Sequence, residues 1–261
     1  MRALFSAASG MEAQQMRIDS IANNIANVTT TGFKKSRPEF EDLFYETVQL
    51  PGATSQSGSQ LPTGVQIGHG VRLASMTRVF SGGDKIATGN ALDLAVDGEG
   101  FFQVQKEGGD TVYTRDGEFK KNSDGNLVTK GGDLLIPTIN IAADVTNVTV
   151  LPDGTVNVIQ AGSTIPTQVG QVELARFVNN AGLLALGGNL FSVTEASGDP
   201  ETGTPGESGF GALSAGYLEG SNVNVAEELV QMILAQRAFE VNSRVIRAGD
   251  EMLRTAAQLS S

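Results

Sequence analysis

The stretch VAEELVQMILAQRAFEVNSRVIRAGDEML, residues 225–253, decides the fold. Its main apolar line repeats every seven positions, at Val225, Met232, Phe239, Ile246 and Leu253, and is supplemented by Leu229, Ile233, Ala235 and Ala256. A seven-residue repeat places side chains along one stripe of a helix. The pattern predicts a helix of about 30 residues or more, beyond the roughly 8 to 20 that are usual in globular proteins.

A matching helix is expected at the other end of the chain, from about Ala3 to Asn27. Its apolar residues follow a three-then-four spacing, at Leu4, Ala7, Met11, Ile18, Ile21, Ile25 and Val28. The run from Thr29 to Gly32 ends this helix, with Gly32 suited to a left-handed terminal position. The C-terminal helix is expected to begin after a capping residue, Ser221 or Asn222, and Glu227 and Glu228 suit its positive end.

The middle of the chain has the pattern of β-hairpins. Asp-Gly pairs at 97–98, 116–117, 124–125 and 153–154 separate short apolar or β-branched runs, which predict strands over 92–96, 101–104, 145–151, 155–159 and 189–194. An aromatic patch over 33–45 is expected to form one or two helical turns. Residues 51–70 read as an extended segment or long loop, and residues 195–211 as a surface loop.

Composition excludes several classes of function. The 261 residues are 40% apolar, which is enough for one sizeable core or two smaller ones. Cysteine is absent, so disulfides and zinc-thiolate sites are excluded. The net charge of −11 disfavours binding to nucleic acid or to an anionic membrane surface. Polar residues interrupt the N-terminus too often for a secretory signal, and no apolar run is long enough to cross a bilayer.

No residue pattern carries catalysis or cofactor chemistry. A calcium loop over 120–131 would need a ligand at Lys120 and a glutamate at Gly131, so that motif fails. Gly98-Glu99-Gly100 precedes a predicted strand and not a helix, which excludes a dinucleotide site. His69 is the sole histidine and is expected in an exposed loop. We therefore expect no enzyme activity, no cofactor and no metal.

The two helical stripes have two readings. They could pack against each other as an antiparallel hairpin and close a monomeric core. Such a slender pair would still expose flanks at Met16, Ala22, Ala26, Ile233 and Val245, so we favour a helix pair whose remaining faces contact neighbouring copies. The expected assembly interface comprises Leu4, Met11, Ile18, Ile21, Ile25, Val28, Val225, Leu229, Met232, Ile233, Phe239, Ile246 and Leu253.

Both ends carry motifs that resemble those of the bacterial flagellar rod and hook proteins. The N-terminal motif is ANNIANV at 22–28 with TGFK at 31–34, and the C-terminal motif is SNVNVAEE at 221–228 with QRAFE at 236–240. The segments at 61–71, 97–104 and 113–119 are similar to the distal-rod branch of that family. Ile25 and Phe239 stand where leucine and tyrosine are usual. The signature residues are Asn23, Asn24, Asn27, Gly32, Phe33, Asn222, Asn224, Gln236, Arg237 and Glu240.

The resemblance implies an α+β protein in which long terminal helices form a coiled-coil domain around a central all-β domain of hairpins. The expected domains are 1–32 with 222–261 for assembly, 33–70 as a connecting segment with an extended insert, and 71–221 as the β-rich outer domain. The implied function is a structural subunit of the distal rod, an open helical homopolymer that forms a hollow drive shaft and transmits torque from motor to hook.

The implied partners are the other rod subunits, the hook subunit, the surrounding P- and L-ring proteins and the type III export apparatus. The implied location is the flagellar basal body, from periplasm to outer membrane, reached without a cleaved signal peptide and without direct membrane insertion. Two alternatives stay open: another axial subunit, in the proximal rod or hook, or an envelope carbohydrate-binding or hydrolytic β-protein with carboxylates converging near Asp97, Asp116 or Asp153.

Overall fold

The structure is a computed structural model that describes residues 2–50, 63–162 and 165–259. Contacts between Cα atoms divide the chain into two compact units. We call residues 1–25, 36–77 and 224–261 the helical unit, and residues 26–35 and 78–223 the β unit. The expected domains placed 33–70 in a connecting segment, whereas the residues from Ser36 onward pack within the helical unit.

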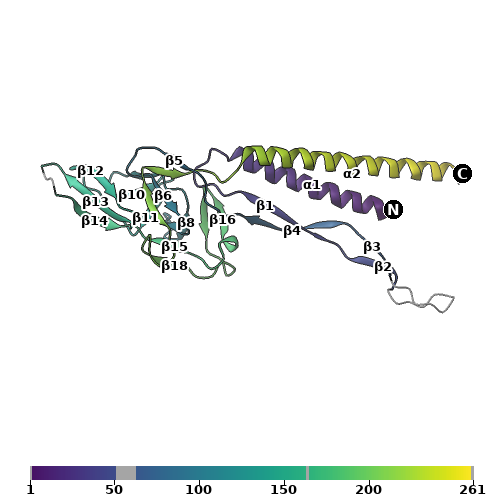
Figure 1. Ribbon diagram of the computed structural model, residues 1–261, viewed down its shortest axis with the longest axis horizontal. Helices are drawn as coiled ribbons and strands as arrows, with labels where there is room; N and C mark the ends of the chain where they lie inside the picture. The colour runs from purple at the N-terminus through teal and green to yellow at the C-terminus, as the bar shows by residue number, and fades with distance from the viewer. Residues whose placement is uncertain (1, 51–62, 163–164, 260–261) are drawn as a thin grey trace. The chain divides into compact units, whose positions relative to one another are not determined.

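The helical unit is built on two long helices, α1 (Arg2–Ala26) and α2 (Val225–Leu259), which lie side by side (Figure 1). They run antiparallel, because Leu4 near the start of α1 meets Gly249 late in α2, while Asn24 near the end of α1 meets Glu228 early in α2. This confirms the expected terminal helices.

Two β-ribbons complete the helical unit. The first pairs β1 (Ser36–Asp42) with β4 (Val71–Arg78), and the second pairs β2 (Tyr45–Gln49) with β3 (Val65–Gly68) in antiparallel register. The expected helical turns over 33–45 are therefore wrong. Phe40 and Tyr45 sit in strands that pair with a later segment, a long-range partner that local spacing does not reveal.

The β unit contains the remaining strands, all joined by antiparallel pairs. Its largest sheet follows the order β16-β17-β8-β7-β11-β10-β9, with β15 pairing to β7 and β18 to β15. The bounds are β7 Phe101–Gln105, β8 Thr111–Thr114, β9 Phe119–Lys121, β10 Leu127–Thr129, β11 Leu134–Ile136, β15 Leu174–Arg176, β16 Leu184–Gly187, β17 Leu190–Ser192 and β18 Glu201–Gly203.

Three smaller sheets accompany it. A three-stranded sheet has the order β12 (Val145–Val150), β13 (Thr155–Gln160) and β14 (Thr167–Gln171). β6 (Leu94–Asp97) pairs with β19 (Ala212–Ala215), and β5 (Lys85–Ala87) pairs with β20 (Tyr217–Glu219). A short 3-10 helix, η1, spans Asn180–Gly182. The expected β-rich domain is confirmed, and Figure 1 shows the short strands. The Asp-Gly turns at 124–125 and 153–154 join hairpins, whereas the strands beside those at 97–98 and 116–117 pair with other strands and not with each other.

The core of the β unit holds apolar residues of the predicted strand 101–104 together with residues of strands that were not predicted. Phe102, Val104, Leu135 and Leu174 are completely buried, and the rings of Phe102 and Phe119 meet edge to face at 5.1 Å between centroids. A second cluster contains Phe101, Tyr113, Ala175, Phe177, Leu183 and Phe191. In β7 the adjacent residues Phe101 and Phe102 point to opposite faces and belong to different clusters, so both faces of this strand are buried.

The segment 195–211 is largely exposed, as expected of a surface loop, but part of it is packed structure. It contains β18, and it includes Ser197, 1% exposed, and Phe210, 9% exposed. The guanidinium of Arg176 lies over the ring of Phe210, with Cζ 5.2 Å from the ring centroid. Its Gly, Pro and Ser content therefore provides turns within packed structure, and composition alone does not distinguish this from an exposed loop.

The ends of the helices use local signals that were predicted in part. Gly32 has φ +68°, which confirms the left-handed conformation expected after α1. The cap of α2 is Asn224, whose Oδ1 accepts the backbone N–H groups of Ala226 at 3.0 Å and Glu227 at 3.3 Å. The expected caps, Ser221 and Asn222, are therefore wrong by two or three positions.

Candidate assembly surface

Helix α2 approaches α1 along a line of small and polar residues. This contact line consists of Glu228, Ala235, Asn242 and Gly249, each seven positions after the last. Ala235 is 1% exposed, and a Cβ on Gly249 would lie 2.5 Å from Cδ2 of Leu4. A Cβ on Gly10 would lie 2.8 Å from Nδ2 of Asn242. Small side chains thus let the two helices come close together, and large apolar residues are left for other faces.

Polar contacts fix the register of the helix pair. Glu228 is 7% exposed, and its Oε2 accepts a hydrogen bond from Nδ2 of Asn24 at 3.3 Å. Asn24 also brackets the start of β1, since its Nδ2 donates to the carbonyl of Ser36 and its Oδ1 accepts from the N–H of Ser36, each at 3.0 Å. Arg17 donates to Gln231 at 2.5 Å. Because buried polar groups need these partners, sliding the helices would cost stability.

The first flank of α2 is the stripe that the sequence predicts. It comprises Val225, Leu229, Met232, Phe239, Ile246 and Leu253. Met232, Phe239 and Ile246 are half-buried, while Val225, Leu229 and Leu253 remain 39%, 47% and 44% exposed. The helix pair therefore covers this stripe only in part.

A second apolar flank of α2 was not predicted as a stripe. It consists of Leu234, Val241, Val245 and Met252, which are 56%, 56%, 43% and 69% exposed. Only Val245 was expected beside the main stripe. The signal was present in the spacing of seven, four and seven residues. With 100° per residue, Val241 lies roughly 160° around the helix from Phe239 of the first flank.

The face opposite the contact line changes character along α2. Val230 and Ile233 are 55% and 56% exposed in its first turns. From residue 237 onward this face is a charged stripe of Arg237, Glu240, Arg244, Arg247, Glu251 and Arg254. Arg237 and Glu240 pair at 2.9 Å, and Arg244 lies 4.0 Å from the same carboxylate. A stripe of exposed ion pairs is stable in water and costly to bury.

The residues expected on α1 lie mostly toward the inside of the helical unit. Ile21 is 5% exposed, and Leu4, Met11, Ile18 and Ile25 are half-buried. Val28 belongs to the β unit and is half-buried there. On the outer side of α1, Phe5 is 71% exposed. Most of the α1 stripe thus serves the packing of the helical unit itself.

The signature residues have structural roles near the ends of the two helices. Asn24, Asn224 and the Arg237–Glu240 pair act as described above. Gly32 approaches the backbone of Asp116 so closely that a Cβ would lie 2.6 Å from its nitrogen, and Phe33 is 7% exposed. Asn222 bonds two neighbouring segments of the β unit. Asn27 accepts a hydrogen bond from Thr30, whereas Asn23 and Gln236 are exposed.

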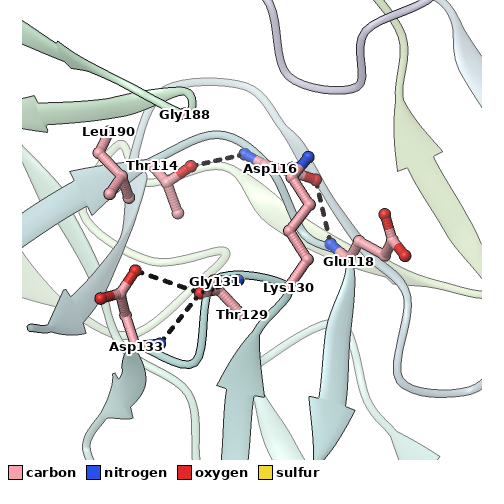
Figure 2. A pocket seen from close by; sticks show the side chains of 9 residues that line it. All are labelled: Thr114, Asp116, Glu118, Thr129, Lys130, Gly131, Asp133, Gly188 and Leu190. Atoms are coloured by element: carbon pink, nitrogen blue, oxygen red, sulfur yellow. Dashed lines mark hydrogen bonds and ion pairs between the residues drawn. The ribbon is translucent and has the colours of Figure 1, made fainter.

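A pocket in the β unit tests the hypothesis of an envelope enzyme. Its volume is about 180 Å³, and its lining residues are Thr114, Asp116, Glu118, Thr129, Lys130, Gly131, Asp133, Gly188 and Leu190. Figure 2 shows the side chain of Lys130 reaching to Asp116, where its Nζ lies 2.5 Å from Oδ2. Oδ1 of the same carboxylate accepts from Thr31 at 3.0 Å and from the N–H of Glu118 at 3.3 Å.

These contacts give Asp116 a structural role. Asp97 and Asp153 do not line this pocket, since Asp97 pairs with Lys85 at 2.7 Å and Asp153 caps a turn by accepting the N–H of Thr155. Asp116 is thus the one member of the expected acidic trio at the pocket, and its oxygens are already bonded. Two further carboxylates line the pocket, and each is bonded: Asp133 accepts from the hydroxyl of Thr129 at 3.3 Å, and Glu118 pairs with Lys120 at 3.0 Å.

Other candidate sites can be placed in the same way. His69 is 47% exposed, with Nδ1 at 3.0 Å from the carbonyl of Phe44, which confirms the expected exposed histidine. Over residues 2–50, 63–162 and 165–259, no group of three or more His, Asp or Glu side chains is placed to hold a metal ion. Within the same residues, neither helix is both long and apolar enough to cross a membrane.

Three family models match separate parts of the chain. Residues 4–34 match the flagella basal body rod protein family, residues 95–158 match the D1 domain of flagellar hook protein FlgE/F/G, and residues 214–259 match the C-terminal region of flagellar basal body rod FlgEFG proteins. The first match covers most of α1, the last covers all of α2, and the middle one covers part of the β unit.

Full-length relatives agree with these matches. The chain is 48% identical to flagellar basal-body rod protein FlgG of Buchnera aphidicola, over 98% of each chain. It is 46% identical to FlgG of Caulobacter vibrioides over the whole of both, and 38% identical to FlgG of Bacillus subtilis over 99% of both. With the flagellar hook protein FlgE of Helicobacter mustelae it shares 44% identity over 51% of this chain and 29% of that protein. The chain belongs to the FlgG family of flagellar basal-body rod proteins.

Proposed function

We propose that this distal rod subunit polymerises through the two apolar flanks of α2. The observation that carries the proposal is the exposure of seven large apolar side chains on the two flanks: Val225, Leu229 and Leu253 on the first, and Leu234, Val241, Val245 and Met252 on the second. A helix that is apolar on several sides is stable when those sides are covered. Because α1 already occupies the contact line, further copies of the chain must cover the flanks.

The angle between the flanks determines the kind of assembly. Two patches roughly 160° apart cannot be covered by one partner helix, so each subunit needs a neighbour on either side. A contact between two different patches of identical subunits propagates into an open helical array unless the rotation happens to close it. The flanks therefore favour a hollow polymer, and the charged stripe of Arg237, Arg244, Arg247 and their carboxylates stays in contact with water.

The partners of such a rod follow from its role as a drive shaft. We assign to this chain the neighbouring rod subunits, the hook subunit, the P- and L-ring proteins and the flagellar export apparatus as partners. The rod spans from the periplasm to the outer membrane and carries torque, with no catalytic step. The net charge of −11 and the bonded state of Asp116 support a structural role without enzyme activity or nucleic-acid binding.

The ribbon of β2 and β3 is our candidate for the element that keeps the rod straight. The segment 51–70, predicted to be extended or a long loop, includes β3. Its residues 51–62 lie outside the described residues. Phe44, Val48 and Leu50, at or beside β2, are 90%, 60% and 67% exposed. A second apolar surface on the same unit would restrict bending once a neighbour covers it. Antibody labelling of isolated basal bodies would locate the chain within the rod.

One experiment tests whether the two flanks bind each other. Leu229→Glu disrupts the first flank, and Val241→Glu disrupts the second. Either purified variant should fail to polymerise, whereas an equimolar mixture should form dimers, because each variant keeps the flank that the other lacks. Analytical ultracentrifugation measures both results. Polymers from either variant alone, or no dimers in the mixture, would contradict the proposal.

A further inference from the structure

The chain passes between the helical unit and the β unit four times, after Ile25, Lys35, Thr77 and Val223. Segments beside three of these crossings are bonded to each other within the β unit. The N–H of Val79 donates to the carbonyl of Lys35 at 2.9 Å. The side chain of Asn222 joins the same two residues, since its Oδ1 accepts from the N–H of Lys35 and its Nδ2 donates to the carbonyl of Val79, each at 2.8 Å.

A buried ionic cluster lies beside this bonded group. The side chains of Lys34 and Glu219 are 0% and 3% exposed, and Nζ of Lys34 lies 2.6 Å from Oε1 of Glu219. That nitrogen also donates to the carbonyl of Ser81 at 2.8 Å, and the same Oε1 accepts the N–H of Gly83 at 3.1 Å. One ion pair thus involves the segments next to the second, third and fourth crossings.

Segment 26–35, which lies between the first two crossings, makes a second contact with Glu219. The N–H of Gly32 donates to the carbonyl of Glu219 at 2.8 Å. Thr31 bonds on both sides, because its hydroxyl donates to Asp116 and its carbonyl accepts from Nδ2 of Asn189 at 2.8 Å. Segment 26–35 is therefore bonded to β20 through Gly32 as well as through Lys34.

The charges make this group cooperative. Arg115, 3% exposed, lies with Nη1 3.5 Å from Oε2 of Glu219, so one carboxylate serves two buried cations. Burial lowers the pKa of Lys34 and also lowers the pKa of Arg115. Removing one partner of a buried ion pair leaves an uncompensated charge, which is far more costly than losing an exposed pair. Opening the segment that carries Lys34 or the one that carries Glu219 therefore leaves the other side chain buried without its ionic partner.

We propose that Lys34, Glu219 and Asn222 form a junction clamp that makes the chain crossings open and close as one cooperative element. The clamp serves to keep the segments that enter and leave the two helices from moving independently. Its mechanical consequence, the transmission of twist within a rod subunit, rests on the function proposed above. Its cooperativity does not, because it belongs to the single chain.

Hydrogen exchange on the full-length monomer, measured by mass spectrometry, tests the clamp. Glu219→Gln keeps the shape of the side chain and removes its charge. Peptides covering residues 29–36, 78–84 and 216–223 should all exchange at least about 100-fold faster, and to the same degree, because a broken buried pair opens them together. The matched control is Glu201→Gln, which removes the carboxylate from the exposed pair with Arg176 and should leave those three peptides unchanged.

Faster exchange in 216–223 alone, or no change in any peptide, would overturn the clamp. A second variant covers the case in which Glu219→Gln does not fold. Asn222→Ala removes the bridge between Lys35 and Val79 without leaving a buried charge, and it too should raise exchange in all three peptides together. A rise confined to one peptide would be equally decisive against the proposal.

The same variants separate the clamp from the function it rests on. In cells, rods built from Glu219→Gln subunits should assemble, but swimming speed should fall more steeply with medium viscosity than in cells with Glu201→Gln. Wild-type swimming at every viscosity, together with concerted exchange in the monomer, would refute the role in twist and leave the clamp in place. Failure of the wild-type chain to form any polymer would refute the proposed function alone.

Discussion

Substitution of Leu234 by glutamate tests the second flank quantitatively. Leu234 is 56% exposed, so in the monomer the change should alter stability by no more than about 0.5 kcal/mol. In the polymer the exposed part becomes buried. Complete burial of a leucine contributes about 1.5 to 3 kcal/mol, so covering roughly half of it contributes about 1 to 1.5 kcal/mol. Glutamate loses this contribution and adds the cost of desolvating a carboxylate.

The expected effect is on the concentration needed for assembly. A total loss of about 2 kcal/mol per added subunit raises the critical concentration about 30-fold, since 1.4 kcal/mol is a factor of ten. Sedimentation of polymer from a dilution series measures this value. Arg247→Gln is the matched control, because it makes the same change of one charge on the charged stripe. Equal critical concentrations for Leu234→Glu and Arg247→Gln would refute the reasoning.

Three further predictions concern the single chain. Ala235→Leu should weaken the helix pair, because Ala235 is 1% exposed against α1; trypsin should then cut within α2 faster than in the wild type. Gly32→Ala should destabilise the β unit by about 2 kcal/mol or more in urea titrations, because φ is +68° and the added Cβ meets the Asp116 backbone. Burial lowers the pKa of Lys34, so from that pKa up to 10.5 the unfolded chain binds more protons and the free energy of unfolding rises with pH. Lys34→Met should remove this rise in urea titrations across that pH range.

The sequence predicted the parts of the fold that depend on local pattern. The seven-residue spacing from Val225 to Leu253 identified α2, and Asp-Gly turns identified the hairpins β9–β10 and β12–β13. The left-handed Gly32 followed from the same kind of signal. Each of these rests on residues close together in the chain, where geometry and residue type are directly linked.

Elements that depend on distant partners were missed. β1 pairs with β4, which begins 35 residues after the start of β1. The aromatic patch over 33–45 was predicted to be helical because local spacing does not reveal so distant a partner. The junction clamp joins Lys34 to Glu219, which are 185 positions apart. The second flank was overlooked for a different reason. Leu234, Val241 and Met252 have helical spacing, but the prediction placed a single apolar stripe on a helix that has apolar residues on two faces.

The central claim is that both flanks of α2 become buried between copies while the charged stripe stays in water. The chain has no cysteine, so single cysteines can report each face without background. The measurement is the rate of thiol labelling of Val241→Cys and Arg247→Cys, in the monomer and in the polymer. We predict that assembly slows labelling at position 241 by about 100-fold or more and leaves position 247 within a few-fold of its monomer rate. Equal labelling of position 241 in monomer and polymer would contradict the account.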